Sequence, residues 1–159
     1  MARKAPLLIQ RELLLDGSGQ PVSETMDSLI RLLRGDRPVW LVAEQASGWR
    51  PTRRSVDLDL VLQQQIHQWT RRAGAALDGV LYLPEGLFVR RRRRNAQLDD
   101  LASRYDVTAA DLTVIARDAG LLETLVLCGG RALAVGEQRV EGATQLADLE
   151  AAIALISKQ

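Results

Sequence analysis

The side chains of this chain that could do chemistry follow two of its short apolar runs. Gln10 and Glu12 come at the end of the first run, and Arg117 and Asp118 follow a later one. A carboxylate can attack phosphorus, whereas the amide oxygen of Gln10 cannot form the acyl-phosphate that carboxylate nucleophilic catalysis requires. Mg²⁺ prefers hard oxygen ligands, and the guanidinium of Arg117 repels it. Of these four residues, only Glu12 and Asp118 therefore offer the carboxylate that attack on phosphorus or binding of Mg²⁺ would need.

A run of basic residues, formed by Arg90, Arg91, Arg92, Arg93 and Arg94, is the second candidate site. Five adjacent basic side chains can neutralise the phosphates of a nucleic acid or of another polyanion. No aromatic residues are interleaved with the run, so base stacking is not indicated. We expect the run to lie in a solvated loop at the rim of the site.

Cysteine and histidine do not indicate a metal site. Cys128 and His67 are the only residues of their types, which excludes an internal disulfide and leaves no ligand cluster. We expect Cys128 to be buried as a small hydrophobe and His67 to lie at the surface. Trp49 follows a predicted strand and is a candidate for ligand contact. The apolar stretch near the N-terminus is too short for a signal peptide or a membrane span, so a cytoplasmic protein is expected.

Composition and patterning predict one globular α/β domain. The 159 residues include 21 basic and 20 acidic side chains, and 47% of them are hydrophobic. We expect a single domain over residues 1–159, with residues 1–6 flexible. Short apolar runs alternate with stretches of helical periodicity. The expected strands are residues 7–10, 39–43, 80–83, 112–116 and 132–135. The first expected helix begins at residue 23 or 24. The other expected helices are residues 56–73, the region around 98–105, 121–127 and 146–156.

This order of elements predicts a doubly wound, Rossmann-like parallel sheet of about five strands with helices on both faces. Right-handed crossovers place the helices on the two faces of such a sheet. Ligands in these folds bind beyond the carboxyl ends of the strands. The loops that begin at Gln10, Ala43, Leu83 and Ala116 are therefore expected to form the site.

The motifs at these strand ends resemble those of the haloacid dehalogenase-like phosphatases, in particular the group of D-glycero-D-manno-heptose 1,7-bisphosphate phosphatase and the histidinol-phosphatase domain. Residues 7–15 resemble the strand hhhhDxDG, and residues 43–48 resemble the TNQSG segment. Residues 91–96 stand where that family has RKPxPG, and residues 115–121 where it has VGDxxxD. The resemblance extends from residue 7 to residue 156 and implies the fold of that family.

At nearly every catalytic position of the family this chain differs. Gln10 and Glu12 replace the two aspartates, and Ala43 replaces the hydroxyl that holds a phosphate oxygen. Arg92 stands for the phosphate-binding lysine. Arg117 and a leucine occupy the two metal-binding positions of the fourth strand, and Asp118 could substitute only after a shift of one residue. The zinc loop of the group is absent as well. The resemblance thus implies a pseudoenzyme, for which we expect neither a metal nor another cofactor.

We interpret the sequence as a catalytically degenerate phosphatase-like protein that acts by binding, with another protein or a second copy of the chain as its partner. Arg90, Arg91, Arg92, Arg93, Arg94 and Trp49 are the expected binding residues. Two alternatives stay open. One is a residual or altered phosphatase that uses Glu12 and Asp118 with Mg²⁺. The other is a binder of nucleic acid or another polyanion through the arginine run.

Overall fold

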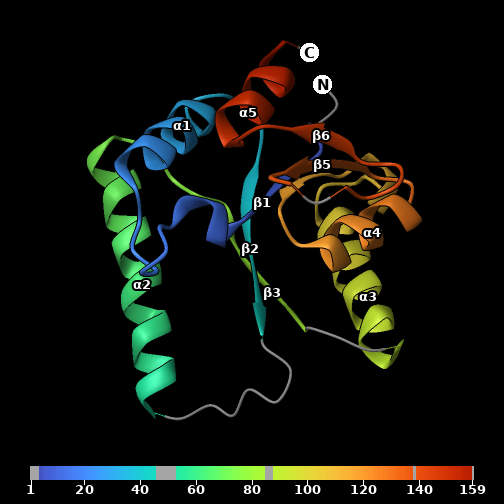
Figure 1. Cartoon of the computed structure of the whole chain (residues 1–159), viewed down its shortest axis with the longest axis horizontal. Helices are drawn as coiled ribbons and strands as arrows, with labels where there is room; N and C mark the ends of the chain where they lie inside the picture. The colour runs from blue at the N-terminus through green and yellow to red at the C-terminus, as the bar shows by residue number, and fades with distance from the viewer. Residues whose placement is uncertain (1–3, 46–52, 85–87, 138, 159) are drawn as a thin grey trace.

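The computed structural model of the chain describes residues 4–45, 53–84, 88–137 and 139–158 (Figure 1). Its centre is a six-stranded sheet in the order β3-β2-β1-β4-β5-β6, in which every neighbouring pair is parallel. The strands are β1 (Leu7–Gln10), β2 (Val39–Gln45), β3 (Gly79–Pro84), β4 (Thr113–Ala116), β5 (Arg131–Val135) and β6 (Thr144–Leu146). The predicted doubly wound parallel sheet is confirmed, with one strand more than expected.

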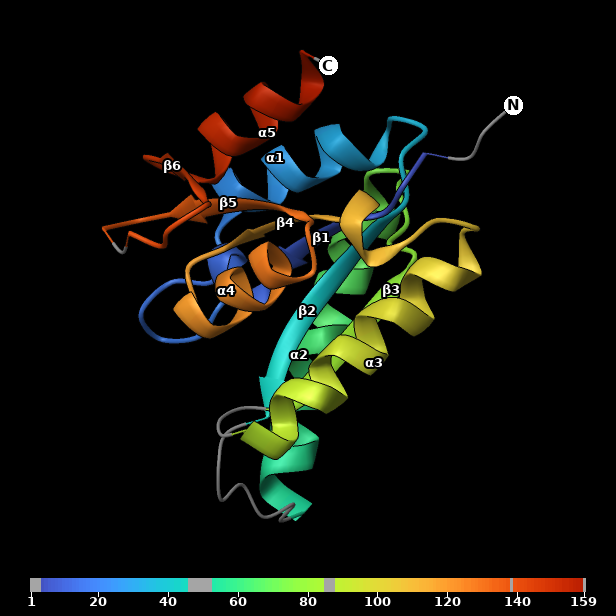
Figure 2. The same cartoon turned by 90° about the vertical axis from the view of Figure 1, so that its right-hand side faces the viewer.

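Helices cover both faces of the sheet. They are α1 (Ser23–Leu33), α2 (Arg53–Arg72), α3 (Phe88–Arg104), α4 (Ala119–Leu127) and α5 (Leu149–Ser157), joined by the short 3-10 helices η1 (Arg11–Leu14) and η2 (Ala109–Asp111). Helices α1, α2 and α5 pack on one face, and α3 and α4 pack on the other. In Figure 2, α3 and α4 lie in front of the sheet and α2 lies behind it.

The strands are apolar on both sides because both sides are buried. Successive strand residues point to opposite faces, so Leu7 and Ile9 join the core beneath α1, α2 and α5, whereas Leu8 joins the core beneath α3 and α4. All four residues of β1 are buried. This continuous run of buried residues carries Gln10 to the carboxyl end of the strand with little freedom of position.

Trp40 shows why one glycine of the sheet is required. A Cβ atom on Gly79 would lie 2.5 Å from the ring of Trp40, so any larger residue there would displace the indole. The indole N–H donates a hydrogen bond to the hydroxyl of Tyr105 over 2.8 Å, and the guanidinium of Arg104 lies over the ring. This contact ties strands β2 and β3 to the end of α3.

Two predicted elements are wrong in part. Residues 90–94 do not form a loop but belong to α3, which begins at Phe88. Arginine is a good helix former and neither glycine nor proline interrupts the segment, although no apolar periodicity marks it as a helix. The helix predicted from residue 146 begins instead at Leu149, because the carboxylate of Asp148 caps it by accepting from the N–H of Ala151, and residues 144–146 form β6.

Within the described residues, no helix combines the length and the apolar character needed to cross a membrane.

Candidate functional site

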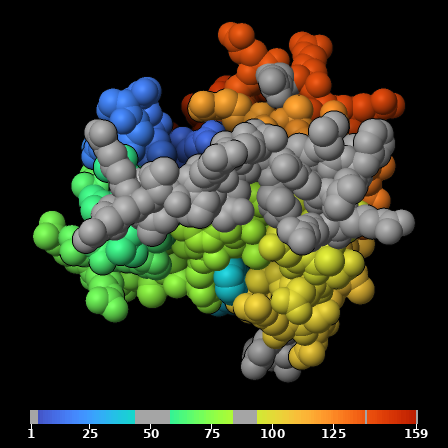
Figure 3. Space-filling view, turned by 90° about the horizontal axis from the view of Figure 1, so that it is seen from below, coloured from blue at the N-terminus to red at the C-terminus, as the bar shows by residue number. Residues whose placement is uncertain are grey.

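The candidate site lies at the carboxyl edge of the sheet, towards which β2 and β3 point downwards in Figure 1 and which faces the viewer in Figure 3. Strand β1 pairs with β2 on one side and with β4 on the other. The chain therefore winds in opposite directions from this point, and the loops after β1 and β4 separate there. Ligands of doubly wound folds bind in the crevice that such a separation leaves. Gln10 ends β1, and Arg117 and Asp118 follow β4.

The side chain of Gln10 is held at this point by main-chain groups. Gln10 is only 5% exposed, and its Oε1 atom accepts hydrogen bonds from the N–H of Arg117 at 2.7 Å and from that of Asp118 at 3.0 Å. Its Nε2 atom donates to the carboxylate of Glu12 over 3.3 Å. Because both groups facing Oε1 are donors, the orientation of the amide is fixed. The two lone pairs of the oxygen are therefore engaged by the protein itself.

Asp118 and Arg94 form the next part of the site. The carboxylate of Asp118 accepts from the N–H of Leu121 over 2.8 Å and so caps α4. A Cβ atom on Gly120 would lie 3.1 Å from Nη1 of Arg94 and 3.2 Å from Oδ2 of Asp118, so both groups flank this glycine. Arg94 is 6% exposed. The last arginine of the run is thus turned into the protein at the start of α4.

The other predicted site residues are dispersed. Ala43 is buried near the end of β2, while Glu12 and Arg117 are exposed beside Gln10. The side chains of Arg90, Arg91, Arg92 and Arg93 lie outside the described part of the structure, as does the whole of Trp49. The assignment of the lysine position to Arg92 therefore stays a prediction, whereas Arg94 is the arginine that the structure places beside Asp118.

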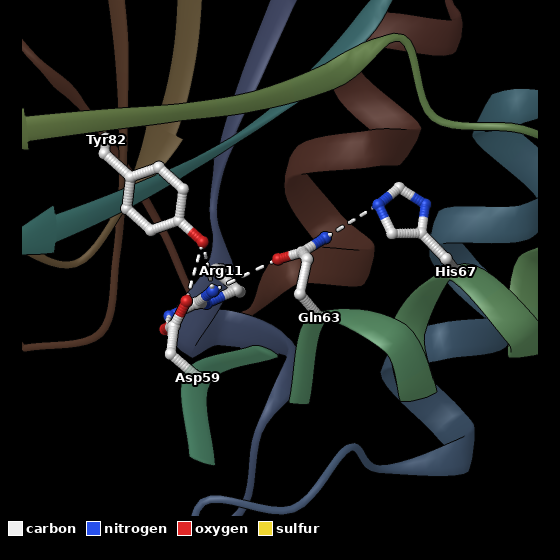
Figure 4. Close-up of polar contacts among 5 residues, drawn as sticks. All are labelled: Arg11, Asp59, Gln63, His67 and Tyr82. Atoms are coloured by element: carbon white, nitrogen blue, oxygen red, sulfur yellow. Dashed lines mark hydrogen bonds and ion pairs between the residues drawn. The ribbon is translucent and has the colours of Figure 1, made fainter. Parts of the chain in front are cut away.

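A second polar cluster at the same edge is absent from the sequence-based predictions (Figure 4). Arg11, which directly follows Gln10, donates to Oδ1 of Asp59 at 2.5 Å and to Oε1 of Gln63 at 3.1 Å, both on α2. The hydroxyl of Tyr82 on β3 donates to Oδ2 of Asp59 at 2.7 Å, and the guanidinium of Arg11 lies 5.7 Å from the centre of the Tyr82 ring. We call Arg11, Asp59, Gln63 and Tyr82 the Arg11 cluster. It joins the end of β1 to α2 and β3.

The cluster shifts the pKa values of its acidic members in opposite directions. Burial raises the pKa of Asp59, but the hydrogen bonds from Arg11 and Tyr82 and the charge of Arg11 outweigh burial, so the pKa lies below its ordinary value of 3.8. Burial and the hydrogen bond to Asp59 raise the pKa of Tyr82 above its ordinary value of 10.0. At neutral pH the cluster therefore holds an ionised carboxylate between a guanidinium and a neutral phenol.

His67 and Cys128 differ from their predicted settings. His67 is half-buried rather than exposed, and its Nε2 atom lies 3.2 Å from Nε2 of Gln63. Because Oε1 of Gln63 faces Arg11, which can only donate, the amide nitrogen faces His67, whose Nε2 must accept. Cys128 is half-buried at the end of α4 and packs against the core beneath α3 and α4, and burial raises the pKa of its thiol.

The described residues do not fit a magnesium ion. They contain no group of three or more acidic, histidine or cysteine side chains placed to hold a metal. At the strand ends the oxygen of Gln10 is taken by two N–H groups, and the carboxylate of Asp118 caps a helix. Arg117 adds a positive charge in the same loop. Mg²⁺ needs several oxygen ligands in near-octahedral arrangement, and this set does not supply them.

Similarity to known proteins is found in structure and not in sequence. No protein-family profile matches the chain, and no curated protein does. Among solved structures, D,D-heptose 1,7-bisphosphate phosphatase from B. bronchiseptica, complexed with magnesium and phosphate, is similar with a TM-score of 0.74 at 18% identity, over 97% of this chain and 98% of that one. The chain has the haloacid dehalogenase-like fold.

Two further structures agree. D,D-heptose 1,7-bisphosphate phosphatase from Burkholderia thailandensis has a TM-score of 0.69 at 14% identity, over 98% of this chain and 100% of that one. A putative phosphatase of the same fold from Mesorhizobium loti has a TM-score of 0.72 at 14% identity, over 99% and 86% of the two chains. The expected fold family is thus confirmed over nearly the whole chain, while identities this low establish the fold alone.

Proposed function

We propose that this protein keeps the framework of a haloacid dehalogenase-like phosphatase but acts by binding another protein instead of hydrolysing phosphate esters. The observation that carries the proposal is the setting of Gln10. Attack on phosphorus at the end of β1 needs a carboxylate with a free lone pair. Gln10 offers an amide, and both lone pairs of its oxygen accept from the main chain of the loop after β4. A cytoplasmic location is part of the proposal and stays a prediction.

Residual phosphatase activity would need Glu12 and Asp118 to take over the lost roles. Glu12 is exposed and bonded to the amide of Gln10, and Asp118 caps α4 beside Arg94. Moving either carboxylate onto a metal would break these contacts. The charge of Arg117 would oppose the metal as well. The geometry therefore favours a binding role over altered catalysis.

Polyanion binding is less well supported than protein binding. Residues 90–94 lie in α3, where successive residues are rotated by about 100° around the axis. Five consecutive helical positions spread around the whole circumference, and Arg94 is buried. A run divided in this way cannot follow a phosphate backbone along one face. It can still contribute local positive charge to a protein interface.

Hydrolysis of p-nitrophenyl phosphate with and without Mg²⁺ tests the loss of catalysis. We expect no Mg²⁺-dependent turnover by the native chain. We also expect none from the Gln10→Asp variant, because the second aspartate, the hydroxyl at position 43 and the metal carboxylates are still missing. Turnover that requires Mg²⁺ and disappears in Gln10→Ala would overturn the proposal. Asp118→Asn tests the alternative of residual phosphatase activity. If the native chain did hydrolyse the ester with Glu12 and Asp118, this variant would lose that turnover.

A further inference from the structure

Helices α1 and α2 lie on the same face of the sheet, and a groove runs between them (Figure 1). Its volume is about 560 Å³, which is within the range of sites that hold small molecules. Neither Gln10 nor any member of the Arg11 cluster lines this space, so it is separate from the polar clusters at the strand ends. We call it the α1–α2 groove.

The side of α2 that faces the groove is polar. Gln65, Gln68 and Arg72 recur at helical spacing along one side of α2 and line the groove. In a close-packed pair of helices such a row is apolar, and the two axes lie about 8–10 Å apart. Amide and guanidinium groups cost free energy when they are buried without partners, so this row keeps the space open to solvent. The sequence of α2 therefore builds the groove.

Hydrogen bonds hold both ends of the α1–α2 groove. At one end lies Gln20 of the loop before α1, and the carboxylate of Asp16 orders this loop by accepting from the N–H of Gln20 over 3.1 Å. At the other end, the guanidinium of Arg34 donates to the carbonyl of Ala73 over 3.3 Å and joins the ends of α1 and α2. A site that is ordered before binding loses less conformational entropy when a ligand enters.

The polar side chains of the groove are available to a ligand. Within the described part of the chain, none of these side chains makes a hydrogen bond or an ion pair with another protein group: Gln20, Asp27, Gln65, Gln68 and Arg72. Amides both donate and accept, a carboxylate accepts, and a guanidinium donates. The formal charges of Asp27 and Arg72 cancel. This set therefore suits a ligand without net charge that carries donors as well as acceptors.

The apolar lining of the groove favours a flat ring. Trp69 is half-buried: it packs against the core beneath α1, α2 and α5 and also borders the groove, as does Ile30. Nucleobases stack on aromatic side chains. Carboxamides form paired hydrogen bonds with the edge of a purine, as glutamine does with adenine. The hydroxyl groups of a ribose can donate to the carboxylate of Asp27 and accept from the guanidinium of Arg72.

We infer that the α1–α2 groove is a binding site for a neutral purine nucleoside. The base lies against Trp69, the amides of Gln65 and Gln68 bind its edge, and the two charged side chains bind the ribose. A nucleotide fits less well, because Asp27 repels its phosphate and the described lining offers a single guanidinium to hold it. The site is independent of the proposed binding of a partner protein.

Titration of the full chain with adenosine, followed by NMR, tests the inference. We expect the largest shifts at the indole N–H of Trp69 and at the carboxamides of Gln65 and Gln68, saturating at millimolar adenosine or below. Adenosine 5′-monophosphate and glucose are the comparison ligands. Both should bind more weakly, the first because of its phosphate and the second because it has no base. No shifts, shifts centred on Gln10 and Arg117, or equal or tighter binding of either comparison ligand would overturn the inference.

Matched variants place the site on one side of α2. Gln68→Ala removes an amide from the groove, whereas Gln64→Ala removes the same group from an exposed position of the helix outside the groove. By calorimetry, Gln68→Ala is expected to lower the affinity for adenosine at least about threefold, because a hydrogen bond to the ligand is lost. Gln64→Ala should leave the affinity unchanged, and circular dichroism confirms that both variants fold. Equal affinities of the two variants would overturn the inference, whereas Mg²⁺-dependent phosphatase turnover would overturn only the proposed function.

Discussion

Gln10 and Arg11 are neighbours in the chain, yet they organise two different polar clusters at the same edge of the sheet. Gln10 turns towards β4, where its side-chain oxygen accepts from two main-chain N–H groups. Because every residue there other than proline would keep its N–H, only a substitution of Gln10 itself can remove these two hydrogen bonds. Arg11 turns towards α2 and β3 and is held by three side chains that substitution could change one at a time. The first cluster joins the end of β1 to the loop after β4. The second joins the end of β1 to α2 and β3.

The contrast shows that two adjacent residues at one edge of a sheet can be held by different means, one by main-chain donors and the other by side chains. A main-chain donor pair needs an acceptor whatever the function, and glutamine satisfies it without a charge. The Arg11 cluster instead fixes the position of α2 relative to β3, because Arg11 and Tyr82 both bind Asp59. The variants below separate the two roles, beginning with the largest expected effect.

Gln10→Met should cause the largest loss of stability. Methionine has a similar length but leaves the N–H groups of Arg117 and Asp118 without their acceptor, so we expect the free energy of unfolding to fall by about 2–4 kcal/mol. Urea denaturation measures the loss. Gln10→Glu is the control, because it keeps an acceptor oxygen and should cost less, although it adds a charge beside Glu12. Equal losses in the two variants would show that the main-chain bonds do not hold the site.

Arg11→Met should cost less, about 1–2 kcal/mol, because Asp59 is partly exposed and solvent screens the ion pair. Tyr82→Phe removes the hydrogen bond that the hydroxyl donates to Asp59 and the longer one that it accepts from Arg11, and because both are exposed to solvent it should cost about 0.5–1 kcal/mol. A double-mutant cycle by urea denaturation measures their coupling. We expect the double variant to lose less than the sum of the single losses, since both partners bind Asp59. Strict additivity would mean that the cluster does not act as a unit.

The stability of the protein should depend on the ionisation of Asp59. Its pKa is lower in the folded state than its ordinary value of 3.8, so its contribution is present above that pH and is lost as the pH falls below it. Urea denaturation between pH 3 and pH 6 measures the dependence. In Asp59→Asn we expect the difference in stability from the native chain to shrink towards low pH. A difference that stays constant over this range would contradict the role of the carboxylate.

Replacing Arg91, Arg92 and Arg93 together with alanine should have the smallest effect on stability. Alanine and arginine are both good helix formers, so α3 should keep its helical content and the change should stay within about 0.5 kcal/mol per residue. Circular dichroism and urea denaturation check this. The same variant should bind the partner protein more weakly at low salt and with a flatter salt dependence. Unaltered affinity at low salt would show that these arginines are only solvated.

Periodic apolar residues determined how much of the fold could be predicted. The first strand and the start of α1 agree with the structure because their apolar runs are bounded by polar and turn-forming residues. The start of α3 was missed because an arginine run carries no periodicity, and β6 was missed because three residues, two of them polar, give no strand pattern. The length and the apolar content of a helix or strand, more than the intrinsic propensities of its residues, therefore decide whether it can be predicted from the sequence.

The candidate site could be predicted only where the motif is local. The positions of Gln10, Arg117 and Asp118 followed from the ends of buried strands, and the structure brings these residues together. The Arg11 cluster could not be found, because Asp59 and Tyr82 lie 48 and 71 residues from Arg11 in the chain. The sequence holds one signal of this cluster: Asp59 is an acidic residue between the apolar residues Leu58 and Leu60 of a helix. A carboxylate in such a place indicates a basic or hydrogen-bonding partner from another element.

The two outer strands of the sheet limit how this protein can aggregate. Strand β6 has only three residues, and β3 at the opposite edge ends at Pro84, which has no N–H to donate to an added strand. Short edges and edge prolines hinder the addition of strands from other chains. Fibre growth by continuation of the sheet is therefore disfavoured at both ends, and the concentrated protein should leave solution, if at all, as amorphous material.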